Sequence, residues 1–216
     1  MNPVEATTRG IFPVWKPAGI SSFSAIYQIR KITGESKVGH AGTLDPLAEG
    51  ILVIAIGRDS TKKLFSSDFK EKEYTALIEL GAISTTDDLE GTLTHTTNYT
   101  KPTIEEIENT LQEFKGNILQ KPPAFSALKI NGVRSYKKAR KGQVFEIKER
   151  PAEIISIELA SYNWPEVELK ITTGPGVYIR SIARDLGEKL KTGGYLKKLI
   201  RTRVGIYTKK EALWLP

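Results

Sequence analysis

The sequence contains no cysteine, and only two of its 216 residues are histidine. Without cysteine there can be no disulfide framework, no thiolate nucleophile and no cysteine-ligated zinc. No run approaches the 18 or so apolar residues of a membrane-spanning helix, and the polar N-terminus does not resemble a signal peptide. These absences predict a cytoplasmic protein with no membrane partner.

The charge balance is basic. Lys and Arg number 32 against 25 Asp and Glu, which gives a net charge of +7. Apolar residues (39%) and charged residues (26%) occur at ordinary globular levels, so the excess charge indicates a polyanionic partner rather than disorder. The length is enough for one well-packed domain. We expect a single domain over residues 1–216, with residues 1–8 as a loose lead-in.

The most informative stretch runs from Gly39 to Gly57. Residues 51–56 form a continuous apolar run, which predicts a strand buried on both faces. The glycine-containing segment before it, 39–50, predicts a shaped loop. Within that loop Pro46 fixes its own φ and disfavours the helical region for Asp45. The sequence thus predicts a carboxylate on a stiffened turn, a common place for a catalytic group, although most Asp-Pro pairs are only turn residues.

Apolar periodicity predicts the remaining elements. We expect strands at 11–15, where Pro13 favours an edge or a bulge, and at 72–80, and a hairpin of 154–162 with 166–173. The segment 58–69 is a short helix or a loop. Three amphipathic helices are expected. Ser21-Ser22 can cap the first, which Gly34 ends, and Thr103 with Glu106 forms a capping box for the second. Their apolar faces comprise Phe23, Ile26, Ile29 and Ile32; Ile104, Ile107, Leu111 and Phe114; and Ile179, Ile182, Ala183, Leu186 and Leu190. The pattern predicts an α+β fold with a mixed, largely antiparallel sheet flanked by helices.

Two charged clusters support different interpretations. Asp87, Asp88 and Glu90 could supply oxygen ligands to a divalent metal, as in a metal-dependent phosphoesterase, although their spacing matches no EF-hand. Residues 134–141 carry five cations and Tyr136, which suits phosphate neutralisation and base stacking but also describes a solvated helix face.

Six segments together resemble the TruB family of tRNA pseudouridine synthases. They are WKPAGISS, HAGTLDPLAEGILVIAIG, GAISTTDDLEG, QKPPAFSALKINGVRSYKKAR, YIRSIARDLG and GYLKKLIRTR. The resemblance extends over residues 9–208 and implies the pseudouridine synthase fold. Many family members continue into a C-terminal PUA domain, and we expect none in this chain. Thr173, Pro175-Gly176-Val177 and Tyr195 depart from the family pattern, which puts loop contacts with RNA in more doubt than catalysis.

The resemblance implies the reaction. A TruB enzyme isomerises the T-loop uridine at tRNA position 55 to pseudouridine, so the expected partner is the T-arm stem-loop of tRNA. Asp45 would be the catalytic carboxylate, Tyr74 would stack on the base and handle a proton, and Arg180 would pair with Asp45. No cofactor, metal or obligatory protein partner is implied, and we expect a monomer. A non-catalytic RNA-binding module is the alternative.

The resemblance also implies the substrate-binding residues. Leu199 would pack against the target base, and His40 would fill the space that the extruded base leaves, unless it only bonds a loop carbonyl. Lys16 is counted here as a marker of the fold beside the site, without a chemical role. The remaining expected RNA contacts are Lys129, Arg134, Tyr136, Lys137, Lys138, Arg140, Lys141, Tyr178 and the cations of 197–203.

Overall fold

The computed structural model describes residues 10–64 and 66–215. The expected lead-in at 1–8 lies outside them. The chain divides into two compact units. The first contains the chain up to Thr75 together with Leu199 onward, and the second is Ala76–Lys198. Strands β4 (Lys72–Leu80) and β12 (Gly194–Val204) each have residues in both units.

The first unit is built on a mixed sheet. Its other elements are β1 (Gly10–Lys16), α1 (Ser22–Thr33), β2 (Val38–Ala41), β3 (Glu49–Ile56), α2 (Arg58–Lys63), the 3-10 helix η1 (Ser67–Phe69), β13 (Tyr207–Thr208) and β14 (Leu213–Trp214). The strand order is β14-β1-β3-β12, with β2 paired to β3 and β13 to β12. β3 runs antiparallel to β1 and β2 but parallel to β12. The predicted strand at 51–56 is therefore confirmed, buried between neighbours.

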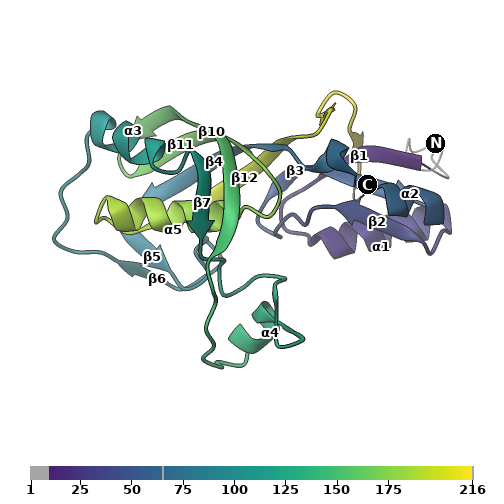
Figure 1. Ribbon diagram of the computed structural model, residues 1–216, viewed down its shortest axis with the longest axis horizontal. Coiled ribbons are helices and arrows are strands. Elements are labelled where there is room, and N and C mark those ends of the chain that lie inside the picture. The colour runs from purple at the N-terminus through teal and green to yellow at the C-terminus, as the bar shows by residue number, and fades with distance from the viewer. Residues whose placement is uncertain (1–9, 65, 216) are drawn as a thin grey trace. The chain divides into compact units, whose positions relative to one another are not determined.

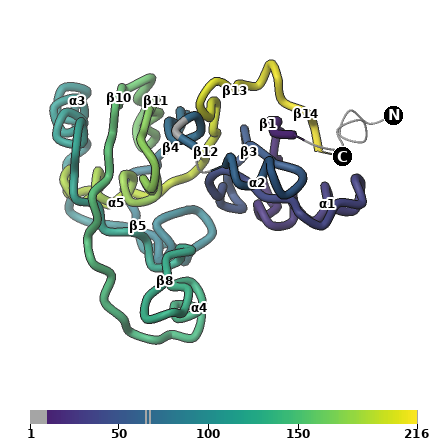
Figure 2. Tube along the Cα trace, turned by 45° about the vertical axis from the view of Figure 1, so that its right-hand side comes forward, coloured from purple at the N-terminus to yellow at the C-terminus, as the bar shows by residue number. Residues whose placement is uncertain are grey.

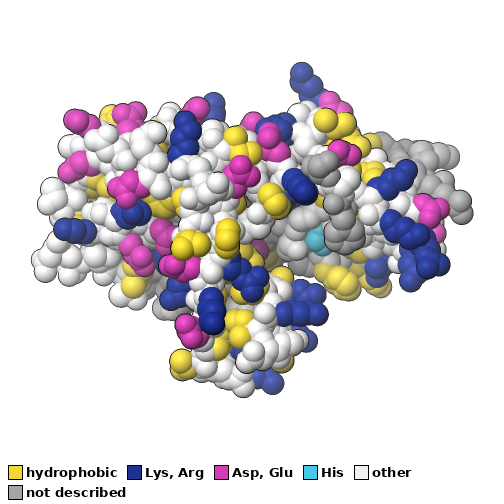
Figure 3. Space-filling model, in the orientation of Figure 1, with side chains coloured by type: hydrophobic (Ala, Val, Ile, Leu, Met, Phe, Trp, Pro, Cys, Tyr) yellow, Lys and Arg dark blue, Asp and Glu magenta, His cyan; other side chains and the backbone are white. Residues whose placement is uncertain are grey.

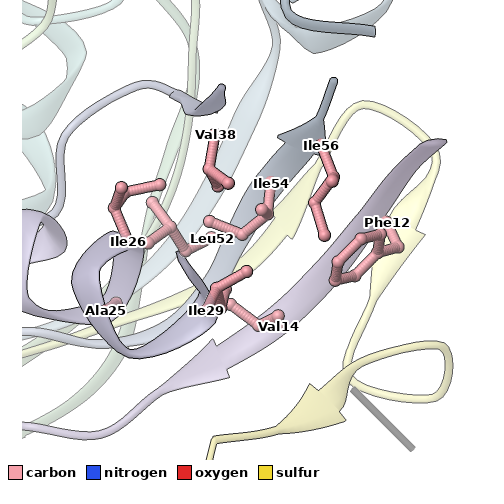
Figure 4. Packing of buried hydrophobic residues seen from close by; sticks show 9 residues of the cluster. All are labelled: Phe12, Val14, Ala25, Ile26, Ile29, Val38, Leu52, Ile54 and Ile56. Atoms are coloured by element: carbon pink, nitrogen blue, oxygen red, sulfur yellow. The ribbon is translucent and has the colours of Figure 1, made fainter. Parts of the chain in front are cut away.

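Helix α1 covers this sheet with a narrow apolar face. Figure 4 shows Ala25, Ile26 and Ile29 of the helix directed toward Val14 and Leu52, together with other side chains of β1, β2 and β3. The expected caps are present, because the Ser21 side chain accepts from the Ser24 nitrogen and Gly34 is left-handed at φ 68°. This packing places the N-terminus of α1 against the loop that precedes β3.

Phe23 was expected on that buried face, and this prediction is wrong. Its side chain is 69% exposed. The buried stripe begins instead at Ser22 and continues through Ala25, Ile26 and Ile29. Since successive helical residues lie about 100° apart, the residue after Ser22 turns outward.

Gly50 allows β12 to approach β3 closely. It pairs with Arg201 across the parallel strands, and a Cβ at this position would lie 2.3 Å from the Arg201 carbonyl oxygen. Its φ of +119° also disfavours any other residue. The glycine therefore sets how near β12 lies to the end of the loop before β3.

The second unit is a largely antiparallel sheet with helices. Its elements are the rest of β4 and β12, β5 (Ala82–Ser84), β6 (Leu93–His95), α3 (Ile104–Gln112), β7 (Gly116–Gln120), β8 (Lys129–Ile130), β9 (Val133–Arg134), α4 (Ser135–Ala139), β10 (Arg150–Asn163), β11 (Glu166–Thr173) and α5 (Ile179–Lys189). The sheet order is β4-β11-β10-β7. The expected hairpin is β10–β11, in which Asn163 pairs with Glu166. Figures 1 and 2 show α4 on a segment that projects from this sheet, and Figure 2 also labels β8 there.

The helices of the second unit follow their predicted apolar faces with one exception. Ile107, Leu111 and Phe114 are buried, whereas Ile104, at the first residue of α3, is 55% exposed. The capping box of Thr103 and Glu106 is present. With the antiparallel hairpins and parallel β3–β12 pair, these elements confirm the predicted α+β class.

Candidate active site and nucleic-acid interface

Asp45 lies in the loop that joins β2 to β3. Its side chain is partly buried, and its carbonyl oxygen accepts a 3.1 Å hydrogen bond from the Ala48 nitrogen. That bond closes a turn around Pro46 and Leu47. The structure therefore confirms the shaped turn before a buried strand that the Asp45-Pro46 pair predicted.

The main chain on each side of Asp45 is bonded to the segment around the start of α1. The Ser22 hydroxyl donates to the Leu44 carbonyl oxygen and accepts from the Leu44 nitrogen, both at 2.8 Å. On the other side, the Gly19 nitrogen donates to the Pro46 carbonyl oxygen at 2.8 Å. The WKPAGISS segment thus has a physical role, because it supplies donors to both neighbours of the carboxylate residue.

Arg201 supplies a third attachment to this loop. Its side chain is fully buried. Nε donates to the Ile51 carbonyl oxygen at 2.7 Å and Nη2 to that of Gly42 at 3.1 Å, and Nη1 makes a longer 3.5 Å contact with that of Thr43. Residues 197–203 were expected to supply phosphate contacts, and for Arg201 this prediction is wrong because its guanidinium is directed into the protein.

Two other cations of that segment, Lys197 and Arg203, form ion pairs with acids. Lys197 donates to Glu79 at 2.6 Å and to Glu166 at 2.7 Å. Arg203 pairs with Glu71 at 2.6 Å and Glu73 at 3.6 Å. A phosphate would have to compete with these carboxylates.

His40 was expected in the loop of residues 39–50, and this prediction is wrong. It belongs to β2 and pairs with Ile54 of β3. Burial and then the charge of Arg201 lower the pKa of the His40 imidazole, while a hydrogen bond with the Gly42 main chain opposes the shift. Among the described residues, its buried Nδ1 has no hydrogen-bond partner. The shift favours the neutral form of the ring, which is held on a strand.

Three more expected site residues lie in the first unit, all of them buried. Lys16 is fully buried and donates to the carbonyl oxygens of Pro17 at 2.8 Å and Ile20 at 2.7 Å, so it orders the turn before α1. Tyr74 of β4 is 7% exposed and Leu199 of β12 is 5% exposed. The first unit therefore contains Asp45, His40, Lys16, Tyr74 and Leu199.

Arg180 lies in the second unit, near the start of α5. It is 5% exposed and forms a 3.3 Å ion pair with Asp88, which is itself 2% exposed. Its guanidinium also donates to the carbonyl oxygens of Thr86 at 3.2 Å and Phe125 at 2.9 Å. Arg180 thus joins the segment after β5 to the segment before β8. Its expected pairing with Asp45 stays a prediction.

Two aspartates of the acidic cluster that suggested a metal form ion pairs with arginines. Arg184 forms ion pairs with Asp87 at 3.0 Å and with Asp185 at 2.7 Å. Arg180 forms one with Asp88. Burial raises the pKa of the Asp87 carboxyl, and the charge of Arg184 opposes that shift. Within residues 10–64 and 66–215 no group of three His, Cys, Asp or Glu could hold a metal ion. The arginine pairs account for Asp87 and Asp88.

The basic stretch forms the projecting segment of the second unit. Lys129, Arg134, Lys137 and Arg140 are exposed, and Figure 3 shows Lys and Arg side chains gathered there among hydrophobic ones. The Arg140 guanidinium lies 5.6 Å from the ring centre of Tyr136. The start of α4 is bonded to the chain before β8, because the Ser135 nitrogen donates to the Leu128 carbonyl oxygen at 2.7 Å and the Tyr136 nitrogen to that of Ser126 at 3.1 Å. The segment is suited to contacting a polyanion, and its RNA contacts stay predictions.

Tyr178 is partly exposed at the residue before α5. Its main-chain nitrogen and oxygen both bond the Gln120 side chain, at 2.9 and 3.1 Å. Gln120 is 2% exposed, so the glycine-rich turn is anchored to β7. The Thr173 departure is a buried residue at the end of β11, whereas Pro175 and Gly176 are exposed.

Sequence reasoning missed Ser22 and Arg201 as residues of the site. Ser22 was considered only as a helix cap, and Arg201 only as one cation of a basic segment. A signal for Arg201 did exist, since it lies two residues after the apolar Leu199 and therefore on the same face of a strand, the face that is buried. No helix in the described part of the chain is long and apolar enough to cross a membrane.

Comparison with known proteins agrees with this architecture. Residues 30–179 match the family model for TruB family pseudouridylate synthase, N-terminal domain. The chain is 41% identical to tRNA pseudouridine synthase B of Prochlorococcus marinus over 96% of its own length and 66% of that protein. It is 44% identical to the same-named protein of Bacteroides fragilis, over 88% of this chain and 84% of that one.

A solved structure of a Cbf5-Nop10-Gar1 complex contains a similar chain. The TM-score is 0.73 at 27% sequence identity, and the match covers 99% of this chain and 55% of that one. A second, an archaeal box H/ACA Nop10-Cbf5 complex, matches with a TM-score of 0.69 at 23% identity and supports the fold alone. The sheet and helices described above are therefore the expected pseudouridine synthase fold, and the chain belongs to the TruB family of pseudouridylate synthases.

Proposed function

We propose that this chain isomerises the T-loop uridine at tRNA position 55 to pseudouridine, with Asp45 as the catalytic carboxylate. Membership of the TruB family and the names of its relatives support the reaction. The observation that carries the assignment of Asp45 is that the main chain of both its neighbours is hydrogen-bonded, Leu44 to Ser22 at the start of α1 and Pro46 to Gly19 in the turn before α1. A carboxylate held in this way is preorganised for chemistry.

The reaction defines what the site must supply. The C1′–N1 glycosidic bond breaks, the uracil turns within the site, and a C1′–C5 bond forms. C5 then loses its proton and N1 gains one, so the product is an isomer of the substrate. Asp45 acts at the sugar or the base, by attack at C1′, by attack at C6 or by promoting elimination. No step requires a redox group.

The other residues have roles around the base. Tyr74 and Leu199 flank the uracil ring, and the Tyr74 hydroxyl is near the proton lost from C5. Arg180 pairs with Asp45 and favours its anionic form, as an opposite charge does. His40 fills the stack left by the flipped nucleotide, an extrusion that costs a few kcal/mol.

The substrate is held by the exposed cations of the second unit. Lys129, Arg134, Lys137 and Arg140 contact phosphates of the T-arm, while Tyr136 and Tyr178 contact bases or sugars. Lys16 orders the loop beside the site rather than touching RNA. The enzyme acts as a monomer, and the T-arm is its only obligatory partner.

The proposal is tested with the purified chain and a T-arm stem-loop, with pseudouridine measured in the product RNA. We expect pseudouridine only at the T-loop position. Asp45→Asn should reduce turnover by several orders of magnitude and leave RNA affinity nearly unchanged, because a transition-state interaction is removed. Asp59→Asn, a charge-matched change of an exposed aspartate on α2, should leave turnover unchanged.

Two outcomes would contradict the proposal. Substantial turnover by Asp45→Asn would show that the carboxylate is not catalytic. Tight binding of the stem-loop by the unaltered chain, with no pseudouridine formed, would instead favour the RNA-binding module.

A further inference from the structure

Arg201 is a fully buried cation whose hydrogen-bond partners, in the part of the chain that the structure describes, are main-chain carbonyl oxygens. Burying a charge is costly unless close partners compensate it. Here a single guanidinium bonds Ile51 of β3 together with Gly42 and Thr43 of the loop before it. The side chain therefore ties the start of that loop to the strand that follows it.

The two loop contacts of Arg201, with Gly42 and Thr43, lie on the N-terminal side of Asp45. Gly42 and Thr43 precede it by three and two residues, and Leu44, held by Ser22, precedes it by one. The carbonyl oxygens of Gly42, Thr43 and Leu44 thus all point to side-chain donors. With three consecutive peptide groups engaged, the backbone entering Asp45 has little freedom.

The charge of Arg201 reaches the neighbourhood of this loop. It contributes, after burial, to lowering the pKa of the His40 imidazole and of the Lys72 amine. The Lys72 side chain lies beside Gly42, where an added Cβ would be 3.0 Å from its Cε. An apolar residue at position 201 could fill the same space. It could neither bond two loop carbonyl oxygens nor lower the pKa values of His40 and Lys72 by its charge.

We propose that Arg201 is a positioning residue for the reaction, and that Ser22 is its counterpart on α1. Together they fix the backbone from Gly42 to Leu44 so that Asp45 is presented to the target nucleotide in reactive geometry. This inference rests on the proposed function of Asp45. It assigns Arg201 to catalysis through the loop, and not to binding of RNA phosphates.

The test is single-turnover kinetics with protein in excess over the T-arm stem-loop. The rate constant at saturating protein does not depend on the folded fraction, so a purely stabilising residue would change only the protein concentration needed for saturation. We expect Arg201→Gln to lower that rate constant about 10- to 100-fold and Ser22→Ala about 10-fold, as small displacements of a reacting group do. Affinity for the stem-loop should stay within about twofold, since neither side chain contacts RNA.

Matched controls come from the other end of α1. Arg30 donates to the Val38 carbonyl oxygen at 3.2 Å, and Thr33 donates to that of Ile29 at 2.8 Å. Arg30→Gln and Thr33→Val remove similar bonds away from Asp45 and should keep the unaltered rate constant. Arg201→Lys retains the charge with fewer donors and should give an intermediate rate.

Combining Ser22→Ala with Arg201→Lys should lower the single-turnover rate constant by less than the product of the two separate fold-reductions. The reason is that both side chains hold the same backbone segment. If Arg201→Gln does not fold, Arg201→Lys and Ser22→Ala decide the matter. Folded variants with the unaltered rate constant would overturn the inference. If Asp45→Asn is inactive in that same series, the proposed function stands and only the role of Arg201 and Ser22 is wrong; an active Asp45→Asn would reject the proposed function itself.

Discussion

The Ser22 hydroxyl pairs with the main chain of Leu44 as a neighbouring strand would, accepting from its nitrogen and donating to its carbonyl oxygen at 2.8 Å each. Ser22 is 2% exposed and is the first residue of α1. The Ser22 side chain thus makes, next to Asp45, the two hydrogen bonds that the backbone of a paired strand would make. The position of the carboxylate thus depends on how α1 packs on β1 and β3.

His40 should matter most when the target base is stacked. We expect His40→Ala to slow the reaction on a folded T-arm stem-loop much more than on an unstructured strand with the same bases, because only the folded substrate must lose stacking. His40→Phe keeps a planar ring and should recover part of the rate. Parallel rate measurements on the two RNAs decide this. Equal losses on both, without recovery by Phe, would assign His40 to the structure of β2.

Removing Arg180 should destabilise the second unit. Arg180→Met leaves the buried carboxylate of Asp88 without its 3.3 Å ion partner. We expect the free energy of unfolding to fall by about 3–5 kcal/mol, as when one member of a buried pair is removed. Urea denaturation measures this. Adding Asp88→Asn should restore part of the loss, because no uncompensated charge remains. A loss below about 1 kcal/mol would contradict the buried-pair interpretation.

Lys72 should make stability rise with pH. Burial, and then the charge of Arg201, lowers its pKa from 10.5 to about 8. Between pH 8 and 10.5 the unfolded chain holds a proton on Lys72 that the folded chain has released, so the free energy of unfolding increases with pH. Below pH 8 both states are protonated and the cost of burying the charge is constant.

The comparison that isolates this effect is with Lys72→Met. The difference in the free energy of unfolding between the unaltered chain and the variant should be flat below pH 8. It should then rise by about 3 kcal/mol, in favour of the unaltered chain, by pH 10.5. Urea denaturation across this range measures it, and a difference that is flat throughout would contradict the shift.

The basic projecting segment should determine the salt dependence of RNA binding. Lys137, Lys138 and Lys141 changed together to Ala should weaken binding of the stem-loop. For every phosphate that the variant no longer neutralises, the slope of log affinity against log salt should become shallower by roughly 0.7 to 0.9. Titrations at several salt concentrations measure the slope.

The control for that experiment removes three exposed lysines from the first unit. Lys31, Lys37 and Lys63 changed to Ala alter the net charge equally, and we expect the slope to stay near that of the unaltered chain. If the two triple variants behave alike, the projecting segment is only a solvated face.

The local part of this structure followed from sequence patterns. The strand of residues 51–56, the Ser21 and Thr103 caps, the β10–β11 hairpin and the turn at Asp45-Pro46 were all predicted, because each depends on periodicity or on residues a few positions apart. Family resemblance, spread over six segments, then indicated Asp45 as the catalytic carboxylate. The expected RNA contacts are not yet tested.

Tertiary packing decided what periodicity left open. Phe23 fitted a helical apolar stripe, yet the α1 face that packs on the sheet begins at Ser22. His40 followed a glycine as a loop residue would, yet it pairs with β3. Arg201 had the charge of a surface cation, yet it is buried and bonds Thr43, 158 positions earlier in the chain.

The sequence by itself predicted the three amphipathic helices and the main strands, and it predicted an aspartate on a rigid turn before a buried strand. Only the tertiary structure decided what holds that turn. Its attachments join Asp45's neighbours to Ser22, 22 residues away from Leu44, and to Arg201 at the far end of the chain. Hydrogen bonds over such separations form only after α1 and β12 have packed against β3, so no local pattern contains them.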